Sequence, residues 1–216
     1  MFDYIRDPAE IYRRSFETLR RETDFDSLPQ GLKPVAERLV HACGMPETIS
    51  NLSWGGEPAE AAHDALTSGA PVMVDSEMVA AGIMKSRLPE RNDIICTLNA
   101  PSTPDLAKAT NNTRSAAAVE LWQDQLEGAV AVFGNAPTAL FRLLELLAKG
   151  APKPAAIMGF PVGFIGAAES KQALIDHAGD IPFLTLKGRL GGSAMAAEQG
   201  ASSKAPGHEM QDRGSR

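Results

Sequence analysis

The chain has 216 residues, of which 44% are hydrophobic, so it is long enough to bury one α/β core and short for two domains. Its formal net charge of -6 argues against general affinity for nucleic acid or for an acidic membrane surface. The two cysteines are far apart and predict neither a disulfide framework nor a zinc site. The N-terminus is charged from its third residue and lacks the apolar segment of a signal peptide, which favours a cytoplasmic protein.

Two amphipathic helices are predicted before any strand. Residues 8–22 have Ile11, Phe16 and Leu19 at helical spacing, and Ser15 lies beside this stripe. Residues 32–43 show a second apolar stripe at three- and four-residue intervals, and Gly44 ends the helix. His41 points away from the stripe, in the last turn of this helix.

Strands and helices then alternate. The predicted strands are 48–53, 71–75, 93–98, 130–133, 155–158 and 182–186; the predicted helices are 58–67, 77–85, 112–127, 138–149 and 167–178. This order is typical of a mainly parallel sheet covered by helices on both faces, in one domain over residues 1–197. Residues 198–216 lack bulky apolar side chains, which predicts a disordered tail.

The stretch 130–173 contains two strand–loop–helix units in succession. Its loops are rich in glycine, and Asn135 is placed to cap the helix that follows it. Ligands of an open parallel sheet bind where such loops leave the carboxyl ends of the strands, so this stretch is the first candidate for a site. The glycines could equally be tight connections that let helices pack closely.

Two cationic side chains are candidates for chemistry. His41 could be a solvated surface histidine, or a general acid whose imidazolium form is favoured by the helix C-terminus. Arg114 falls in the first turn of a helix, where a cation is unfavourable. It could be a tolerated surface arginine, or could bind a carboxylate together with free helix amides. Asp75 follows a strand and could orient a ligand or cap a helix.

Seven ordered blocks indicate a family. They are DYIRDPAEIYRRSF, RLVHACGMPE, EMVAAGI, NTRSAAAVELW, VFGNAPTALFRLLELL, KPAAIMGFPVGFIGAAESKQAL and GRLGGSAMAA. Together they span residues 3–197 and resemble the precorrin-8X methylmutases of cobalamin biosynthesis, in the aerobic-pathway form. The resemblance implies a homodimeric isomerase that moves a methyl group between adjacent ring C carbons of precorrin-8X, giving hydrogenobyrinic acid. It implies no cofactor and no S-adenosylmethionine.

The resemblance also assigns residues. The family's catalytic histidine corresponds to His41 and its substrate-contacting serine to Ser15. Arg114 would bind carboxylates of the substrate. The backbone at four loop positions is expected to let the macrocycle approach closely: Gly134, Asn135, Gly159 and Gly163. Two other functions stay open: a corrinoid carrier without catalysis, and a nucleotide-binding protein, although no GxGxxG or P-loop motif occurs.

Overall fold

A six-stranded sheet forms the centre of the fold. The computed structural model describes residues 1–200, and residues 201–216 lie outside the described part. The strand order is β1-β6-β5-β4-β2-β3, and all neighbours are parallel except β1, which is antiparallel to β6. The strands are β1 (Leu52–Gly55), β2 (Val72–Val74), β3 (Ile94–Ile95), β4 (Val130–Phe133), β5 (Ala156–Gly159) and β6 (Phe183–Leu186).

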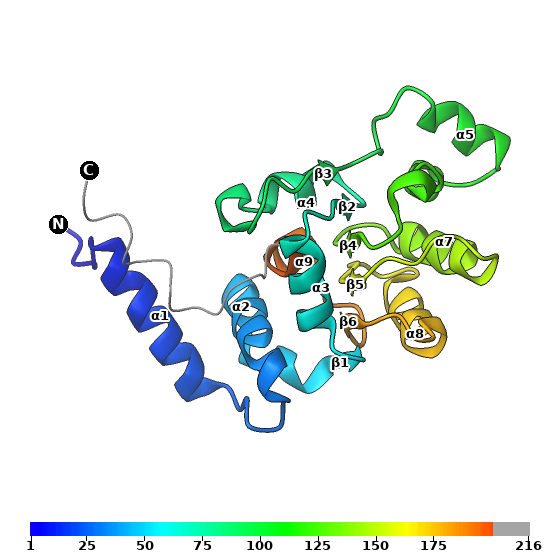
Figure 1. Cartoon of the computed structure of the whole chain (residues 1–216). Coiled ribbons are helices and arrows are strands. Elements are labelled where there is room, and N and C mark those ends of the chain that lie inside the picture. The colour runs from blue at the N-terminus through cyan, green and yellow to red at the C-terminus, as the bar shows by residue number, and fades with distance from the viewer. Residues whose placement is uncertain (201–216) are drawn as a thin grey trace.

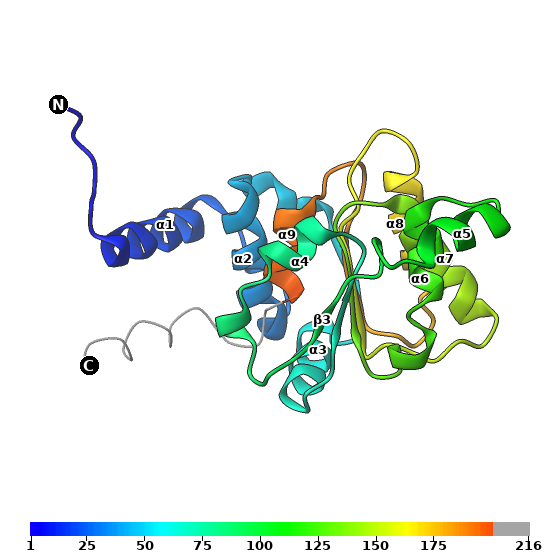
Figure 2. The ribbon, with the colours of Figure 1, turned by 90° about the horizontal axis from the view of Figure 1, so that it is seen from above.

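Helices cover both faces of this sheet, which confirms the predicted fold class (Figures 1 and 2). On one side lie α1 (Pro8–Glu22), α2 (Lys33–Cys43), α3 (Pro58–Thr67), α4 (Glu77–Gly82) and α9 (Ser193–Gly200). On the other side lie α5 (Thr103–Ala109), α6 (Arg114–Glu120), α7 (Pro137–Ala148) and α8 (Ala167–His177). Short 3-10 turns at Gln30–Leu32, Pro46–Asn51, Lys85–Arg87 and Gln123–Gln125 join these elements.

The strands divide the hydrophobic interior into two cores. In β4, Val130 and Val132 pack toward α2, α3 and α9, whereas Ala131 and Phe133 pack toward α7 and α8. All four β4 residues are fully buried. Successive side chains of a strand point to opposite faces, so a strand between two helical layers must be apolar throughout. This explains why the central strands are short unbroken apolar runs.

Several predicted boundaries are wrong, and three of them have a tertiary reason. Residues 48–51 form a 3-10 turn, so β1 begins only at Leu52. The helix predicted over 112–127 ends at Glu120, because the chain turns there to bury Trp122 completely. The sequence did not predict α9, which extends the domain through Gly200. Its Glu198 pairs with Arg87 at 3.0 Å, so the tail expected from residue 198 begins no earlier than residue 201.

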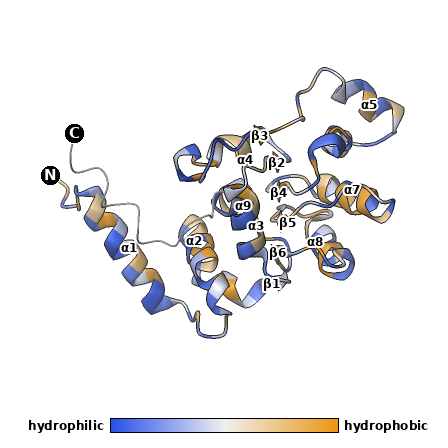
Figure 3. Ribbon diagram, viewed as in Figure 1, coloured by the Kyte–Doolittle hydropathy of each residue, from blue (hydrophilic) through white to orange (hydrophobic). Residues whose placement is uncertain are grey.

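Helix α1 projects from the body of the domain and packs against α2 (Figures 1 and 2). Only Phe16 and Leu19 are buried in it. It is largely hydrophilic, whereas α7 is largely hydrophobic (Figure 3). Although α1 is the longest helix within residues 1–200, neither it nor any other helix in that range has the length and apolar character needed to cross a membrane.

A buried carboxylate joins two neighbouring strand ends. Asp75 follows β2, is only 2% exposed, and accepts hydrogen bonds from the backbone N–H groups of Gly134, Asn135 and Ala136 at 3.0, 2.8 and 2.7 Å. These amides belong to the loop that leads into α7, near the positive end of the helix dipole. Burial raises the pKa of the Asp75 carboxyl, and the three amide bonds oppose that rise.

The first prediction concerns this carboxylate. Asp75→Ala should lower the free energy of unfolding by about 3–5 kcal/mol, because three amides lose a charged acceptor in a buried position. Asp75→Asn keeps the side-chain shape and one acceptor oxygen, so its loss should be smaller. Urea denaturation of the three proteins measures the difference. An alanine variant as stable as the wild type would show that the Asp75 bonds do not stabilise the fold.

Candidate functional site

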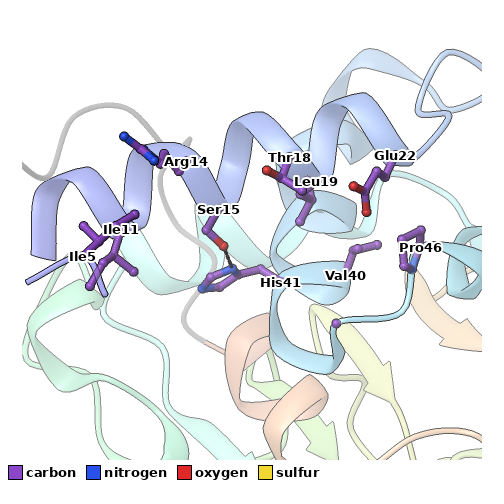
Figure 4. A pocket seen from close by; sticks show the side chains of 11 residues that line it. Ile5, Ile11, Arg14, Ser15, Thr18, Leu19, Glu22, Val40, His41 and Pro46 are labelled. Carbon is purple, nitrogen blue, oxygen red and sulfur yellow. Dashed lines mark hydrogen bonds between the residues drawn. The ribbon is translucent and has the colours of Figure 1, made fainter. Parts of the chain in front are cut away.

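A groove of about 390 Å³ lies between α1 and the C-terminal end of α2 (Figure 4). Its volume is within the range of small-molecule sites, and one side is open to solvent. The lining combines apolar side chains with a few polar ones: Ile5, Ile11, Arg14, Ser15, Thr18, Leu19, Glu22, Val40, His41, Gly44 and Pro46. The sequence singled out two of these polar residues, Ser15 and His41, as parts of one site.

The structure brings Ser15 and His41 together. Ser15 Oγ lies 3.2 Å from His41 Nδ1, and Figure 4 shows the serine pointing from α1 toward the imidazole ring on α2. The ring of Phe16 stacks on His41 with centroids 4.8 Å apart. Since Nδ1 is engaged by the serine, Nε2 is left for a ligand in the groove.

Local structure explains why His41 is exposed in this position. Gly44 adopts a left-handed conformation with φ of 67° and ends α2, so His41 occupies its last turn. The buried face of α2, which includes Leu39 and Val40, turns His41 outward. An ion pair between Arg20 and Glu37, 2.7 Å from Nε to Oε1, fixes α1 beside α2. An imidazolium held in this way can donate a proton to a bound molecule.

Arg114 lies at the start of α6 and is held by the loop after β3. Its Nη2 donates to the carbonyl oxygen of Leu98 at 3.1 Å and to Asn99 Oδ1 at 2.7 Å. These oxygens stabilise a cation that the helix dipole alone disfavours. Thr113 caps α6 by accepting from the N–H of Ala116, so that amide is not free for a ligand as expected. Asn99 was not predicted as a partner, because nothing local links it to Arg114.

His41 and Arg114 do not share a site within one chain. Helix α2 packs in the core on one side of the sheet, and α6 packs against α7 on the other (Figure 2). Both side chains are exposed. The chain therefore presents the predicted acid and the predicted carboxylate-binding residue on separate faces.

Two of the predicted glycine positions are corrected by the structure. Gly134 is buried, and a Cβ there would lie 2.6 Å from Val79 Cγ2 and 2.7 Å from Ala196 Cβ. Gly159 is also buried, and its Cβ would lie 2.6 Å from Leu174 Cδ2. Both glycines allow helices to pack closely on the sheet, which was the alternative interpretation. A ligand cannot reach either α-carbon while these helices cover it.

The other two loop positions are accessible. Asn135 is exposed, but it does not cap α7, since Ala136 is the N-cap and Asp75 binds the Asn135 amide. Gly163 has φ of 146° with open space where a side chain would begin, so the backbone conformation itself requires glycine. Both belong to loops at the carboxyl edge of the sheet.

Asp75 also differs from its predicted roles. It binds the backbone of the loop that leads into α7, whereas Ser76 caps the adjacent α4 by accepting from Val79 N at 3.4 Å. A ligand-orienting role for Asp75 is thus replaced by a structural one. Lys171 and Arg189 were not singled out as site residues, although both fall within family-like blocks that contain glycine loops.

The fold and groove define a class: a single-domain α/β protein with an open small-molecule site next to a histidine. Comparison with known proteins narrows it. A crystal structure of precorrin-8X methyl mutase from Thermus thermophilus is similar with a TM-score of 0.81 and 31% identity, covering 90% of this chain and 94% of that one. Precorrin-8X methylmutases from Pseudomonas aeruginosa and Sinorhizobium sp. are each 52% identical, covering 91% of this chain and 95% and 93% of their own.

A model of the precorrin-8X methylmutase family matches residues 10–199. The chain belongs to the precorrin-8X methylmutase family. The matched region includes α2 with His41, Arg114 and both glycine loops, and it ends within α9.

The second prediction tests the role of Gly134. Gly134→Ala should lower the free energy of unfolding by about 2 kcal/mol, because α4 and α9 must move to admit the methyl group. Gly31→Ala is the matched control, since the nearest atom to its Cβ is 4.0 Å away and its φ is not positive. Thermal and urea unfolding compare the two variants. Equal stability would contradict the packing role.

Proposed function

We propose that the protein is an isomerase that moves a methyl group between adjacent ring C carbons of precorrin-8X and releases hydrogenobyrinic acid. The observation that carries the proposal is the pair formed by Ser15 and His41 in an open groove. Family membership supports the activity. The migration takes place within one molecule, so the reaction requires no methyl donor and no cofactor.

His41 acts as a general acid in this proposal. The protonated ring donates Nδ1–H to Ser15 and offers Nε2–H to the macrocycle. Protonation makes the π-system electron-poor and favours migration of the methyl group to the adjacent carbon. Because substrate and product are isomers, the proton must return to the enzyme before release. The serine keeps the ring oriented through both transfers.

The carboxylate groups at the periphery of the substrate would be bound by residues other than His41 and Ser15. Precorrin-8X has several acetate and propionate groups, and Arg114 is a cation with a fixed orientation that can bind one of them. Asn135, which is exposed, and Gly163, which is half-buried, lie in loops at the carboxyl edge of the sheet. The apolar part of the groove, which includes Ile11 and Val40, suits the ring system itself.

The protein acts as a homodimer in this proposal, with each active site built from two subunits. His41 and Arg114 occupy separate faces of one chain, so one macrocycle can contact both residues when a second copy brings its own α6 to the groove. The projecting N-terminal segment exposes Phe2, Tyr4 and Ile11 by 89%, 64% and 48%. Apolar side chains exposed together are typical of an interaction surface.

The third prediction concerns catalysis. His41→Ala should lower kcat at least about 100-fold while the affinity for hydrogenobyrinic acid stays close to that of the wild type. His63→Ala changes an exposed histidine on α3 and should leave both values unchanged. The absorption spectrum follows conversion of precorrin-8X directly. If wild-type protein bound the substrate and left its spectrum unchanged, the protein would be a corrinoid carrier.

The fourth prediction concerns the subunits. His41→Ala and Arg114→Ala should each be inactive alone, and unfolding and refolding them together should restore roughly a quarter of wild-type activity, because half of the dimers are mixed and each mixed dimer has one intact site. Sedimentation should show a dimer. No recovery in a mixture that contains mixed dimers would contradict a site shared in this way.

A further inference from the structure

Two glycine-rich loops interlock at the carboxyl edge of the sheet. One follows β5 and includes residues 160–166, and the other follows β6 and includes residues 187–192. The N–H of Gly192 donates to the carbonyl oxygen of Phe160 at 2.8 Å, and a Cβ at Gly191 would clash with that same oxygen. The backbones therefore touch directly, without intervening side chains.

A buried lysine on α8 anchors the second loop. Lys171 on α8 has no exposed surface, and its Nζ donates to the carbonyl oxygen of Leu190 at 2.5 Å. Burial lowers the pKa of this amine to about 8. Placing an amine in the interior is costly compared with an apolar side chain of the same size. The loop has three glycines, and only Leu190 packs a side chain against the core, so this bond adds a second attachment at the same residue.

The anchored loops present an unusual surface. Phe164 and Ile165 are 84% and 91% exposed, and the guanidinium carbon of Arg189 lies 5.3 Å from the centre of the Phe164 ring. No carboxylate among residues 1–200 pairs with Arg189. An oriented arginine beside apolar side chains matches a ligand with a flat apolar body and acidic substituents.

We propose that Arg189 is a further substrate-binding residue, which binds one carboxylate of the macrocycle while Phe164 and Ile165 contact its apolar edge, and that Lys171 is a positioning residue for Arg189. This inference rests on the proposed isomerase function. The buried amine of Lys171 binds the residue that follows Arg189, and so it limits the motion of the arginine backbone. A carboxylate is bound more tightly when its partner is already in place.

The first experiment measures substrate binding. Arg189→Gln should raise both KM for precorrin-8X and Kd for hydrogenobyrinic acid about tenfold or more, with kcat less affected, because one charge-assisted contact is lost. Arg189→Lys should restore part of the affinity. Arg91→Gln is the matched charge control, since Arg91 is exposed before β3, at the opposite edge of the sheet. Arg189→Gln values equal to those of Arg91→Gln would overturn the assignment.

The second experiment isolates the anchor. Lys171→Met keeps the apolar length of the side chain and removes the donor to Leu190. Trypsin should cut after Arg189 at least about tenfold faster in folded Lys171→Met than in wild-type protein, and KM should rise as in Arg189→Gln. Cleavage at the wild-type rate with unchanged KM would refute the positioning role.

The same assays separate this inference from the proposed function. If wild-type protein failed to convert precorrin-8X, the isomerase assignment itself would fail. A different result would arise if the loop tip contacted a second subunit. Arg189→Gln would then weaken dimerisation of an active enzyme, but its affinity for hydrogenobyrinic acid would be normal at protein concentrations where it is fully dimeric. That result would show the substrate-binding role to be wrong.

Discussion

The bonds from Asp75 to three successive amides are the constraint on which the carboxyl edge of the sheet depends. They tie the end of β2 to the loop that leads into α7, and they satisfy three backbone amides of that loop inside the protein. The loop between β4 and α7 is thereby fixed to the neighbouring strand end.

Close backbone contacts at glycines also shape the carboxyl edge of the sheet. Gly134 and Gly159 let helices lie directly on the sheet, and Gly191 lets two loops touch. The same residue type thus supports packing in the interior and loop contact at the rim. Gly163 differs from these three glycines, because its φ of 146° favours glycine and open space lies where a side chain would begin. Composition alone cannot separate these uses, because each depends on which element lies opposite the glycine.

The candidate acid and the candidate carboxylate-binding residue lie on different layers of the molecule. The helix α2 places His41 beside Ser15, while α6 and the glycine loops lie around the far side and edge of the sheet (Figure 2). The two residues that we propose to act on one macrocycle, His41 and Arg114, are therefore separated within a single chain.

The sequence by itself determined the alternation of strands and helices, the two-sided sheet, and the outward position of His41, because these follow from local periodicity and from helix-ending residues such as Gly44. It also placed Ser15 and His41 in one site through family resemblance. Tertiary structure alone decided that Asp75 binds the loop before α7, that α9 continues through Gly200, and that Arg114 lies across the sheet from His41. These features depend on contacts between residues distant in sequence, which no local pattern encodes.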